Sequence, residues 1–147
     1  VRSRGLGDVY KRQHWRRWLG IEHRCLVPFT SFSEIDTRPN APRNSPVWFA
    51  LGPERPLAFF AGICTAWTSV RKLKEGEVTT ELFGFLTCAP NAEVAPVHPK
   101  AMPVILTTPE DWRSWLTADT SEALKLQRPL PDGQLRIVME GSRADPA

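Results

Sequence analysis

The sequence predicts an α+β domain in which strands predominate. Short runs of apolar, aromatic and β-branched residues recur along the chain, and clusters of Pro, Gly and Asn separate them. Helical features are confined to short segments, and no internal repeat or interdomain linker is visible. These observations favour one domain with a strand-built core and helices at its margin.

The first elements follow from composition. Residues 15–20 place Trp and Leu before a glycine, which indicates a short helix that ends there. Residues 24–32 are mostly apolar and bounded by turn formers, so we expect a strand. Residues 36–46 contain three prolines and two asparagines, which predict a loop. Residues 47–51 and 57–67 are apolar and aromatic, and predict two strands paired through a turn.

The next elements alternate between polar and apolar segments. Residues 71–77 form a polar loop, and residues 79–88 predict a long strand. Residues 87–96 are a connection with room for one helical turn. Residues 103–106 predict a buried strand, and residues 134–138 predict the last strand.

A second helix has a clear start signal. Thr108 supplies an N-cap hydroxyl, Pro109 suits the first helical position, and Asp111 follows three residues after the cap. The next apolar residues share one helix face through their spacings of three and four, and they are Trp112, Trp115 and Leu116. Residues 121–127 indicate another short helix.

Residues 3–13, Ser-Arg-Gly-Leu-Gly-Asp-Val-Tyr-Lys-Arg-Gln, resemble the translation of a transposase adapter used to prepare sequencing libraries. We therefore expect residues 1–13 to be a non-native leader, residues 14–138 to form one partial domain, and residues 139–147 to be a polar tail. The rival interpretation is a native basic arm. The leader carries four basic residues and one acidic residue, so the rest of the chain is formally neutral although the whole has a net charge of +3. The basic charge is thus no argument for a nucleic-acid partner.

Composition limits the other classes of function. No apolar run reaches the roughly 18 residues that predict a membrane-spanning helix, so we expect no membrane partner. Cys25, Cys64 and Cys88 lie in apolar stretches without Cys-x-x-Cys spacing, which suggests a reducing compartment and buried, apolar thiols. No metal-ligand spacing, phosphate loop, Gly-x-Ser-x-Gly or GxGxxG motif is present, so we expect no metal and no cofactor.

Two segments each place a chemically useful side chain at the end of an apolar run. Residues 24–34, Arg-Cys-Leu-Val-Pro-Phe-Thr-Ser-Phe-Ser-Glu, end in Glu34. Residues 94–106, Val-Ala-Pro-Val-His-Pro-Lys-Ala-Met-Pro-Val-Ile-Leu, hold His98 between two prolines. A solvated turn glutamate and an idle loop histidine are the ordinary alternatives, and position alone favours them.

Together these two segments resemble the SOS-response-associated peptidase (SRAP) family, whose members process abasic sites. That family typically shows an Arg-Cys-Leu-Val-Pro run leading to a glutamate, and later a His-x-Arg-Met-Pro run before an apolar strand. The resemblance covers residues 14 to about 138. It implies a barrel-like mixed sheet with short marginal helices, incomplete at the N-terminus of this chain.

The resemblance also implies covalent chemistry on single-stranded DNA that contains abasic sites. In the family, self-cleavage of the initiator methionine frees a cysteine whose α-amine condenses with the sugar aldehyde and whose thiol closes a thiazolidine ring. Glu34 matches the family's proton-handling glutamate, and His98 matches the histidine that assists imine formation. Thr87 matches a strand-end threonine near that site. Lys100 stands in place of the motif's arginine as a phosphate contact, and a free surface lysine is the alternative for this residue.

This chain departs from the family pattern. The spacing from His98 to Met102 is one residue longer, Ile35 stands where a tryptophan often follows the glutamate, and the N-terminal cysteine is missing. Internal cysteines cannot replace it because they have no free α-amine. We therefore expect a full-length parent that is an SOS-response DNA-repair enzyme with autoproteolytic peptidase and lyase-like activity, and an inactive chain as given. The parent is expected to be monomeric and cytoplasmic, in the bacterial cytosol or nucleoid.

Two alternatives stay open. One is a non-covalent module that binds single-stranded nucleic acid through stacking on Trp15, Trp18 and Trp48. Most tryptophans in a domain of this size are at least partly buried, which weighs against it. The other is a cysteine-dependent hydrolase acting on peptides or other substrates, with His98 essential for turnover.

Overall fold

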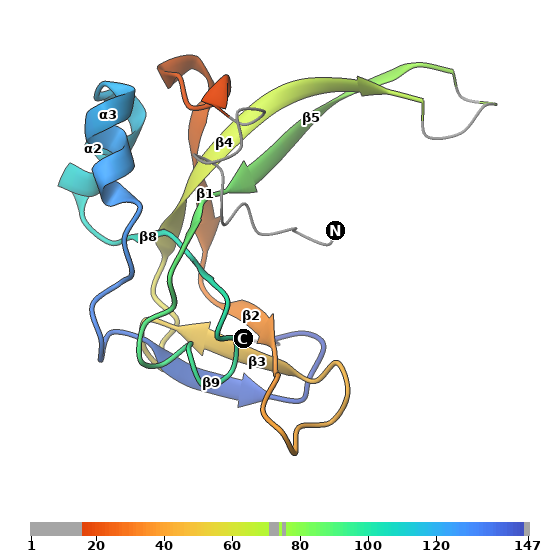
Figure 1. Cartoon of the computed structure of the whole chain (residues 1–147), viewed down its shortest axis with the longest axis vertical. Coiled ribbons are helices and arrows are strands. Elements are labelled where there is room, and N and C mark those ends of the chain that lie inside the picture. The colour runs from red at the N-terminus through yellow and green to blue at the C-terminus, as the bar shows by residue number, and fades with distance from the viewer. Residues whose placement is uncertain (1–15, 71–73, 75, 146–147) are drawn as a thin grey trace.

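The computed structural model describes residues 16–70, 74 and 76–145, and it has the strand-dominated α+β architecture that the sequence predicts (Figure 1). One sheet, called here the β4 sheet, is built on the long strand β4 (Ala58–Ser69), which pairs antiparallel with three strands. These partners are β1 (Arg24–Phe29), β5 (Val78–Phe85) and β8 (Ile105–Leu106).

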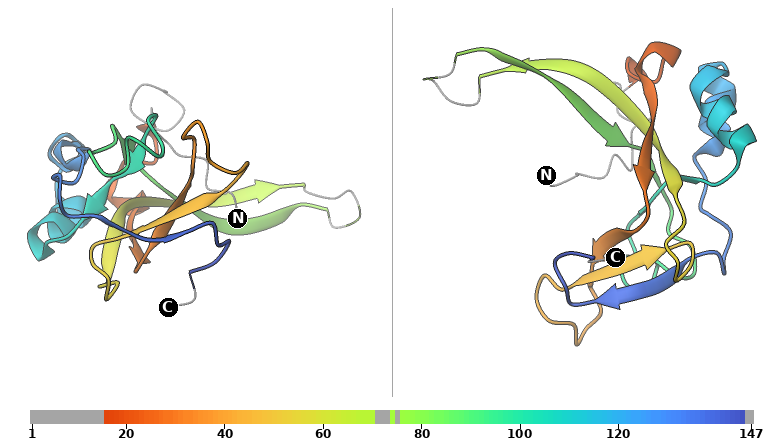
Figure 2. Two further views of the ribbon diagram at one scale, coloured as in Figure 1. Left: turned by 90° about the horizontal axis from the view of Figure 1, so that it is seen from below. Right: turned by 180° about the vertical axis from the view of Figure 1, so that it is seen from behind.

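A second sheet, called here the β3 sheet, is antiparallel in the order β2-β3-β9. Its strands are β2 (Phe32–Ile35), β3 (Pro46–Ala50) and β9 (Arg136–Glu140). A separate two-stranded pair joins β6 (Thr87–Cys88) to β7 (Met102–Pro103). In Figures 1 and 2 the β4–β5 hairpin extends far from the body of the molecule, and the β3 sheet lies at the opposite end.

The barrel implied by the family resemblance is not formed, because both sheets are open among the described strands. Closure requires the edge strands of a sheet to pair with each other. Here β1 and β5 each pair with β4 and with no further described strand, and β9 pairs with β3. The strand order therefore gives separate open sheets in place of one continuous ring.

The strand predicted over residues 24–32 is two strands in different sheets. The chain leaves the β4 sheet after Phe29, bends at Thr30 and Ser31, and joins the β3 sheet at Phe32. The predicted pairing of residues 47–51 with residues 57–67 is also wrong. Both segments are strands, but β3 pairs with β2 and β9, whereas β4 belongs to the other sheet.

Two other predicted strands are interrupted at one point of the core. Residues 79–88 divide at Leu86 into β5 and β6, and residues 103–106 divide at Val104 into β7 and β8. Leu86 donates to Ala61 O (2.9 Å), Ala61 to Val104 O (3.0 Å), and Val104 to Leu86 O (2.9 Å). This closed ring of backbone bonds satisfies all three residues where the strand pairs separate.

The helix predicted from Thr108 is confirmed as α2 (Pro109–Thr117), and the Thr108 hydroxyl accepts the Asp111 N–H at 3.1 Å. The segment predicted as a helix over 121–127 forms α3 (Thr120–Ala123) and the 3-10 turn η2 (Leu124–Leu126). At the N-terminal end, within the described part of the helix predicted over 15–20, Arg16 is helical, residues 17 and 18 form a turn, and η1 (Ile21–His23) follows. At the C-terminal end, β9 continues through the first two residues of the predicted tail.

The core has two parts. One lies between the sheets and is built on a cluster of four phenylalanines with stacked or edge-to-face rings, namely Phe29, Phe32, Phe49 and Phe60. The other lies between the β4 sheet and α2, where Trp115 is 1% exposed and its indole N–H donates to Gly62 O (3.0 Å). The first cluster is the part of the core that bears the candidate site. No helix in the described part of the chain is long and apolar enough to cross a membrane.

Candidate active site

Glu34 is placed by the alternation of strand β2. Side chains two residues apart on a strand share a face, so Glu34 lies on the same side of β2 as Phe32. Phe32 is 8% exposed and packs in the phenylalanine cluster, which orients the strand. The Glu34 side chain is 23% exposed and pairs in register with buried Val47 of β3. A carboxyl group is thus held at the rim of the apolar core.

His98 is placed by a helical turn over residues 92–97. Buried Asn91 caps this turn, since its side-chain oxygen accepts the Val94 N–H (3.2 Å) and its backbone oxygen accepts the Ala95 N–H (2.9 Å). The His98 N–H closes the turn by donating to Val94 O at 2.8 Å. Val94 and Val97 are fully buried in the same core cluster as Phe32, so the turn cannot shift without opening that core.

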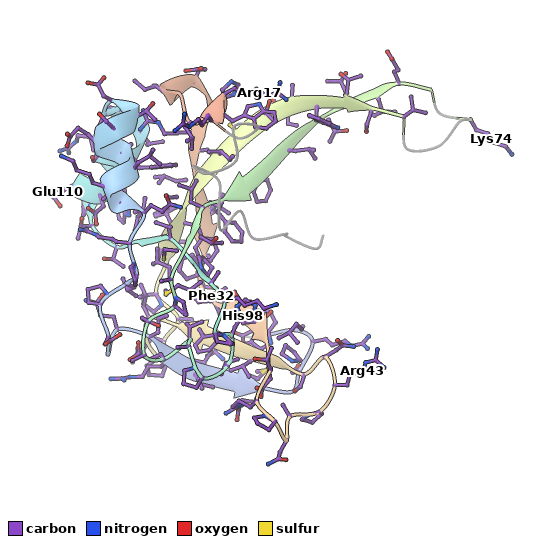
Figure 3. The ribbon with its side chains drawn as sticks, viewed as in Figure 1. Arg17, Phe32, Arg43, Lys74, His98 and Glu110 are labelled. Atoms are coloured by element: carbon purple, nitrogen blue, oxygen red, sulfur yellow. The ribbon has the colours of Figure 1, made fainter. Side chains whose placement is uncertain are left out.

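The two segments are joined directly by Thr37. Its backbone N–H (2.9 Å) and its hydroxyl (2.8 Å) both donate to Val97 O, just before His98. The end of β2 is therefore fixed to the turn. Figure 3 shows His98 in the region of the β3 sheet, far from the outer end of the β4–β5 hairpin at Lys74.

The result is a contact between the carboxyl group and the imidazole. His98 Nδ1 lies 3.8 Å from Glu34 Oε2 and 2.8 Å from the carbonyl oxygen of Ala101. A carbonyl oxygen only accepts, so Nδ1 carries a proton. In the neutral ring Nε2 therefore holds the free lone pair, the proton on Nδ1 is directed to the Ala101 oxygen, and the Glu34 oxygen lies beyond hydrogen-bond distance of Nδ1.

The environment favours the protonated form of Glu34. Burial raises the pKa of this carboxyl above its usual range, and the nearby His98 imidazole acts in the opposite direction. The two side chains are about equally accessible, at 23% and 26% exposed. A protonated carboxyl can donate a proton and an imidazole Nε2 can accept one, so the pair has the elements of general acid–base catalysis.

The other two predicted site residues take no part in this contact. Thr87 is 4% exposed, its backbone oxygen accepts from Gln127 Nε2 (2.9 Å), and its buried hydroxyl has no hydrogen-bond partner among the described residues. Lys100 is an exposed residue two positions after His98. In the described part of the chain, no hydrogen bond or ion pair joins either residue to Glu34 or His98.

The two alternative functions find little support in these surroundings. Trp18 is 6% exposed, and the half-buried Trp48 donates its indole N–H to Ser142 O (2.8 Å). Neither ring is therefore an open stacking platform. Trp15 lies outside the described residues. Burial raises the pKa of the Cys25 thiol to about 12 and of Cys88 to about 11, which disfavours the thiolate that a hydrolase needs at these two cysteines.

Two residues that position the site were not predicted from the sequence. Thr37 and Asn91 act on backbone atoms, and only the capping preference of an asparagine before a turn offered a local signal. Within residues 16–70, 74 and 76–145, no group of three or more His, Cys, Asp or Glu side chains is arranged to hold a metal ion.

Comparison with known proteins agrees with this architecture. A crystal structure of a protein from Bacteroides thetaiotaomicron, a structural-genomics target, superposes with a TM-score of 0.69 at 22% identity, which shows a shared fold. The match covers 88% of this chain and 53% of the other, so the chain spans about half of that protein's length. No curated protein matches the chain significantly. The family model for the SOS response associated peptidase (SRAP) matches residues 6–140. The chain therefore belongs to the SRAP family.

Proposed function

We propose that Glu34 and His98 are the acid–base pair of a protein that processes abasic sites in single-stranded DNA. The observation that carries the proposal is the 3.8 Å contact between a carboxyl group whose pKa is raised by burial and an imidazole whose Nδ1 donates to Ala101 O, which leaves Nε2 as the proton acceptor of the neutral ring. Membership of the SRAP family associates the chain with the response to DNA damage and with peptidase activity. The crosslinking chemistry is our proposal.

The reaction divides into steps that need an acid and a base. The α-amine of an N-terminal cysteine adds to the aldehyde carbon of the opened sugar and gives a carbinolamine. Protonated Glu34 donates to the hydroxyl group, which leaves as water and gives an iminium ion. His98 Nε2 removes the proton from the cysteine thiol, and the sulfur then adds to the iminium carbon and closes a thiazolidine ring.

The nucleophile comes, in this proposal, from a longer protein. The solved structure that shares this fold is almost twice as long as the match, and Cys25, Cys64 and Cys88 have no free α-amine. On this proposal, chain 1–147 does not crosslink DNA.

The test compares chain 1–147 with the longer reading frame recovered by amplifying genomic DNA upstream of codon 14. Each protein is incubated with a single-stranded oligonucleotide carrying one abasic site, and the amount of protein–DNA conjugate is quantified on a denaturing gel. We expect a conjugate only from the longer protein. Its Glu34→Gln variant should form the conjugate more slowly by about 10²–10⁴-fold, the range for general acid–base catalysis.

The matched control is Glu93→Gln, which changes a carboxylate on the turn before His98. Glu93 contacts Asn91 Nδ2 (2.9 Å) and the Gly133 N–H (2.7 Å), and it makes no described contact with His98. This variant should crosslink at the normal rate. A robust conjugate from chain 1–147, or normal rates in Glu34→Gln, would contradict the proposal.

A further inference from the structure

Two of the three cysteines lie on one face of the β4 sheet. Cys25 of β1 pairs in register with Gly62 of β4, and Cys64 is two residues further along β4. Residues two apart on a strand point to the same side, so both thiols emerge on the same face as diagonal neighbours. Cys64 in turn pairs with Phe83 of β5, which is 69% exposed, so this end of the face is open to small solutes.

Gly62 lets the two thiols approach. A Cβ atom built on Gly62 would lie 2.8 Å from Cys25 Sγ, which means that the sulfur occupies space that any other residue would fill. From this position the Cys25 thiol lies beside the thiol of Cys64, which together with burial raises its pKa. Both side chains are half-buried, whereas Cys88 is in a different strand pair and its thiol approaches the carbonyl oxygen of Met102 (3.8 Å).

We propose that Cys25 and Cys64 are a redox-active thiol pair that hydrogen peroxide converts into a cross-strand disulfide. The first thiol reacts with one peroxide molecule to give a sulfenic acid and water. The second thiol then attacks the sulfenic sulfur, its proton leaves with the hydroxyl group as a second water, and the S–S bond forms. Two thiols are oxidised by two electrons in total, and one peroxide is reduced.

The surroundings set the order of these steps. Burial and the neighbouring Cys64 raise the pKa of the Cys25 thiol to about 12, so Cys25 is protonated at neutral pH and reacts slowly with peroxide. Cys64, beside exposed Phe83, is therefore the sulfur that peroxide oxidises, and Cys25 is the thiol that resolves the sulfenic acid. A diagonal pair on adjacent strands is wider than the ideal disulfide geometry, so the bond should be readily reduced.

The test uses chain 1–147 and peptide mapping. The protein is oxidised with hydrogen peroxide, free thiols are alkylated without reductant, and the protein is digested with trypsin. The three cysteines fall on separate tryptic peptides, residues 25–43, 44–71 and 75–100. We expect residues 25–43 and 44–71 to be joined with the loss of two hydrogens, and residues 75–100 to carry the alkyl group on Cys88. Dithiothreitol should separate the joined peptides.

Two variants test which cysteines form the disulfide. Cys64→Ser should abolish the joined peptides, and Cys88→Ser should leave them unchanged. Circular dichroism before oxidation establishes that each variant is folded. The proposal would be overturned by joined peptides that contain Cys88, by a disulfide between two chains, or by oxidation of Cys25 and Cys64 to sulfinic acids without a link. Because the readout is the cross-link alone, it stands or falls independently of DNA processing.

Discussion

Thr37 holds Val97 through two hydrogen bonds to one carbonyl oxygen, at 2.9 Å from its backbone N–H and 2.8 Å from its hydroxyl. Through this oxygen, the strand that carries Glu34 is fixed to the turn that ends at His98. The separation of the two candidate catalytic groups is thus governed by a threonine that touches neither of them in the described contacts.

Replacing Thr37 with valine should loosen this connection. The backbone bond remains while the hydroxyl bond is lost, so we expect a loss of about 0.5–1.5 kcal/mol in the free energy of unfolding. The measurement is urea denaturation followed by tryptophan fluorescence. Thr65→Val is the matched control, because its hydroxyl makes a longer bond, 3.3 Å, to the neighbouring Ala66 O. An equal loss in both variants would show that the Thr37 hydroxyl has no special role.

The raised pKa of Glu34 makes a prediction about stability and pH. A carboxyl whose pKa is higher in the folded than in the unfolded chain stabilises the fold below the unfolded value, and this contribution is lost as pH rises through the folded value. Glu34→Gln should therefore gain stability relative to wild type as pH is raised from acidic to neutral. Thermal unfolding at a series of pH values tests this. A wild-type protein that gains on the variant with rising pH would contradict the burial effect.

Substitutions of His98 can distinguish the structural role of its Nδ1–H from the catalytic role proposed for its Nε2. Asparagine can keep a donor near Nδ1 for Ala101 O, whereas alanine leaves this oxygen without its side-chain donor. His98→Asn should thus be more stable than His98→Ala, by about 0.5–1.5 kcal/mol for one hydrogen bond. Both should lose the proton transfer assigned to Nε2. If only the alanine variant of the longer protein were slow to crosslink, Nε2 would not be the base.

Arg24 offers a test of buried charge. It is 6% exposed, donates to Ala118 O, lies over the Trp115 ring, and has two guanidinium nitrogens without a partner among the described residues. Burial lowers the pKa of this guanidinium. Arg24→Met removes the unpaired donors and keeps the packing, so its free energy of unfolding should stay within about 1 kcal/mol of wild type or rise.

Arg24→Ala is the contrasting variant, since it opens a cavity against Trp115. It should be less stable than Arg24→Met by about 2–5 kcal/mol. Guanidinium denaturation of the three proteins gives both differences. A methionine variant as unstable as the alanine variant would mean that the charge itself stabilises this position.

The parts of the fold that sequence predicts are those with local causes. The start of α2 follows from Thr108 and Pro109, whose effects act within one helical turn. An apolar run does not reveal where a chain changes sheets, so the break between Phe29 and Phe32 was not predicted. Pairing of β3 with β9 joins segments distant in sequence, for which local patterns carry little information.

In the candidate site too, local sequence identifies residues but does not reveal the distant contacts that position them. Glu34 and His98 were identified through family motifs, because a single glutamate near the end of a strand and a single histidine after a turn have no distinctive spacing of their own. Their contact depends on Thr37 and Asn91, whose partners are backbone atoms or distant residues. The roles of Thr87 and Lys100 in substrate binding stay predictions.

Strand β4 also determines the order in which the strands of its sheet can fold. Every other strand of its sheet hydrogen-bonds to β4, and these partners come from widely separated parts of the described chain, from Arg24 to Leu106. Only the hairpin with β5 pairs near neighbours in sequence, since Ser69 faces Val78. Hairpins close in microseconds, whereas distant pairings must first overcome loop-closure entropy. The order of folding should therefore be the β4–β5 hairpin first, with β1 and β8 added to a template that already exists.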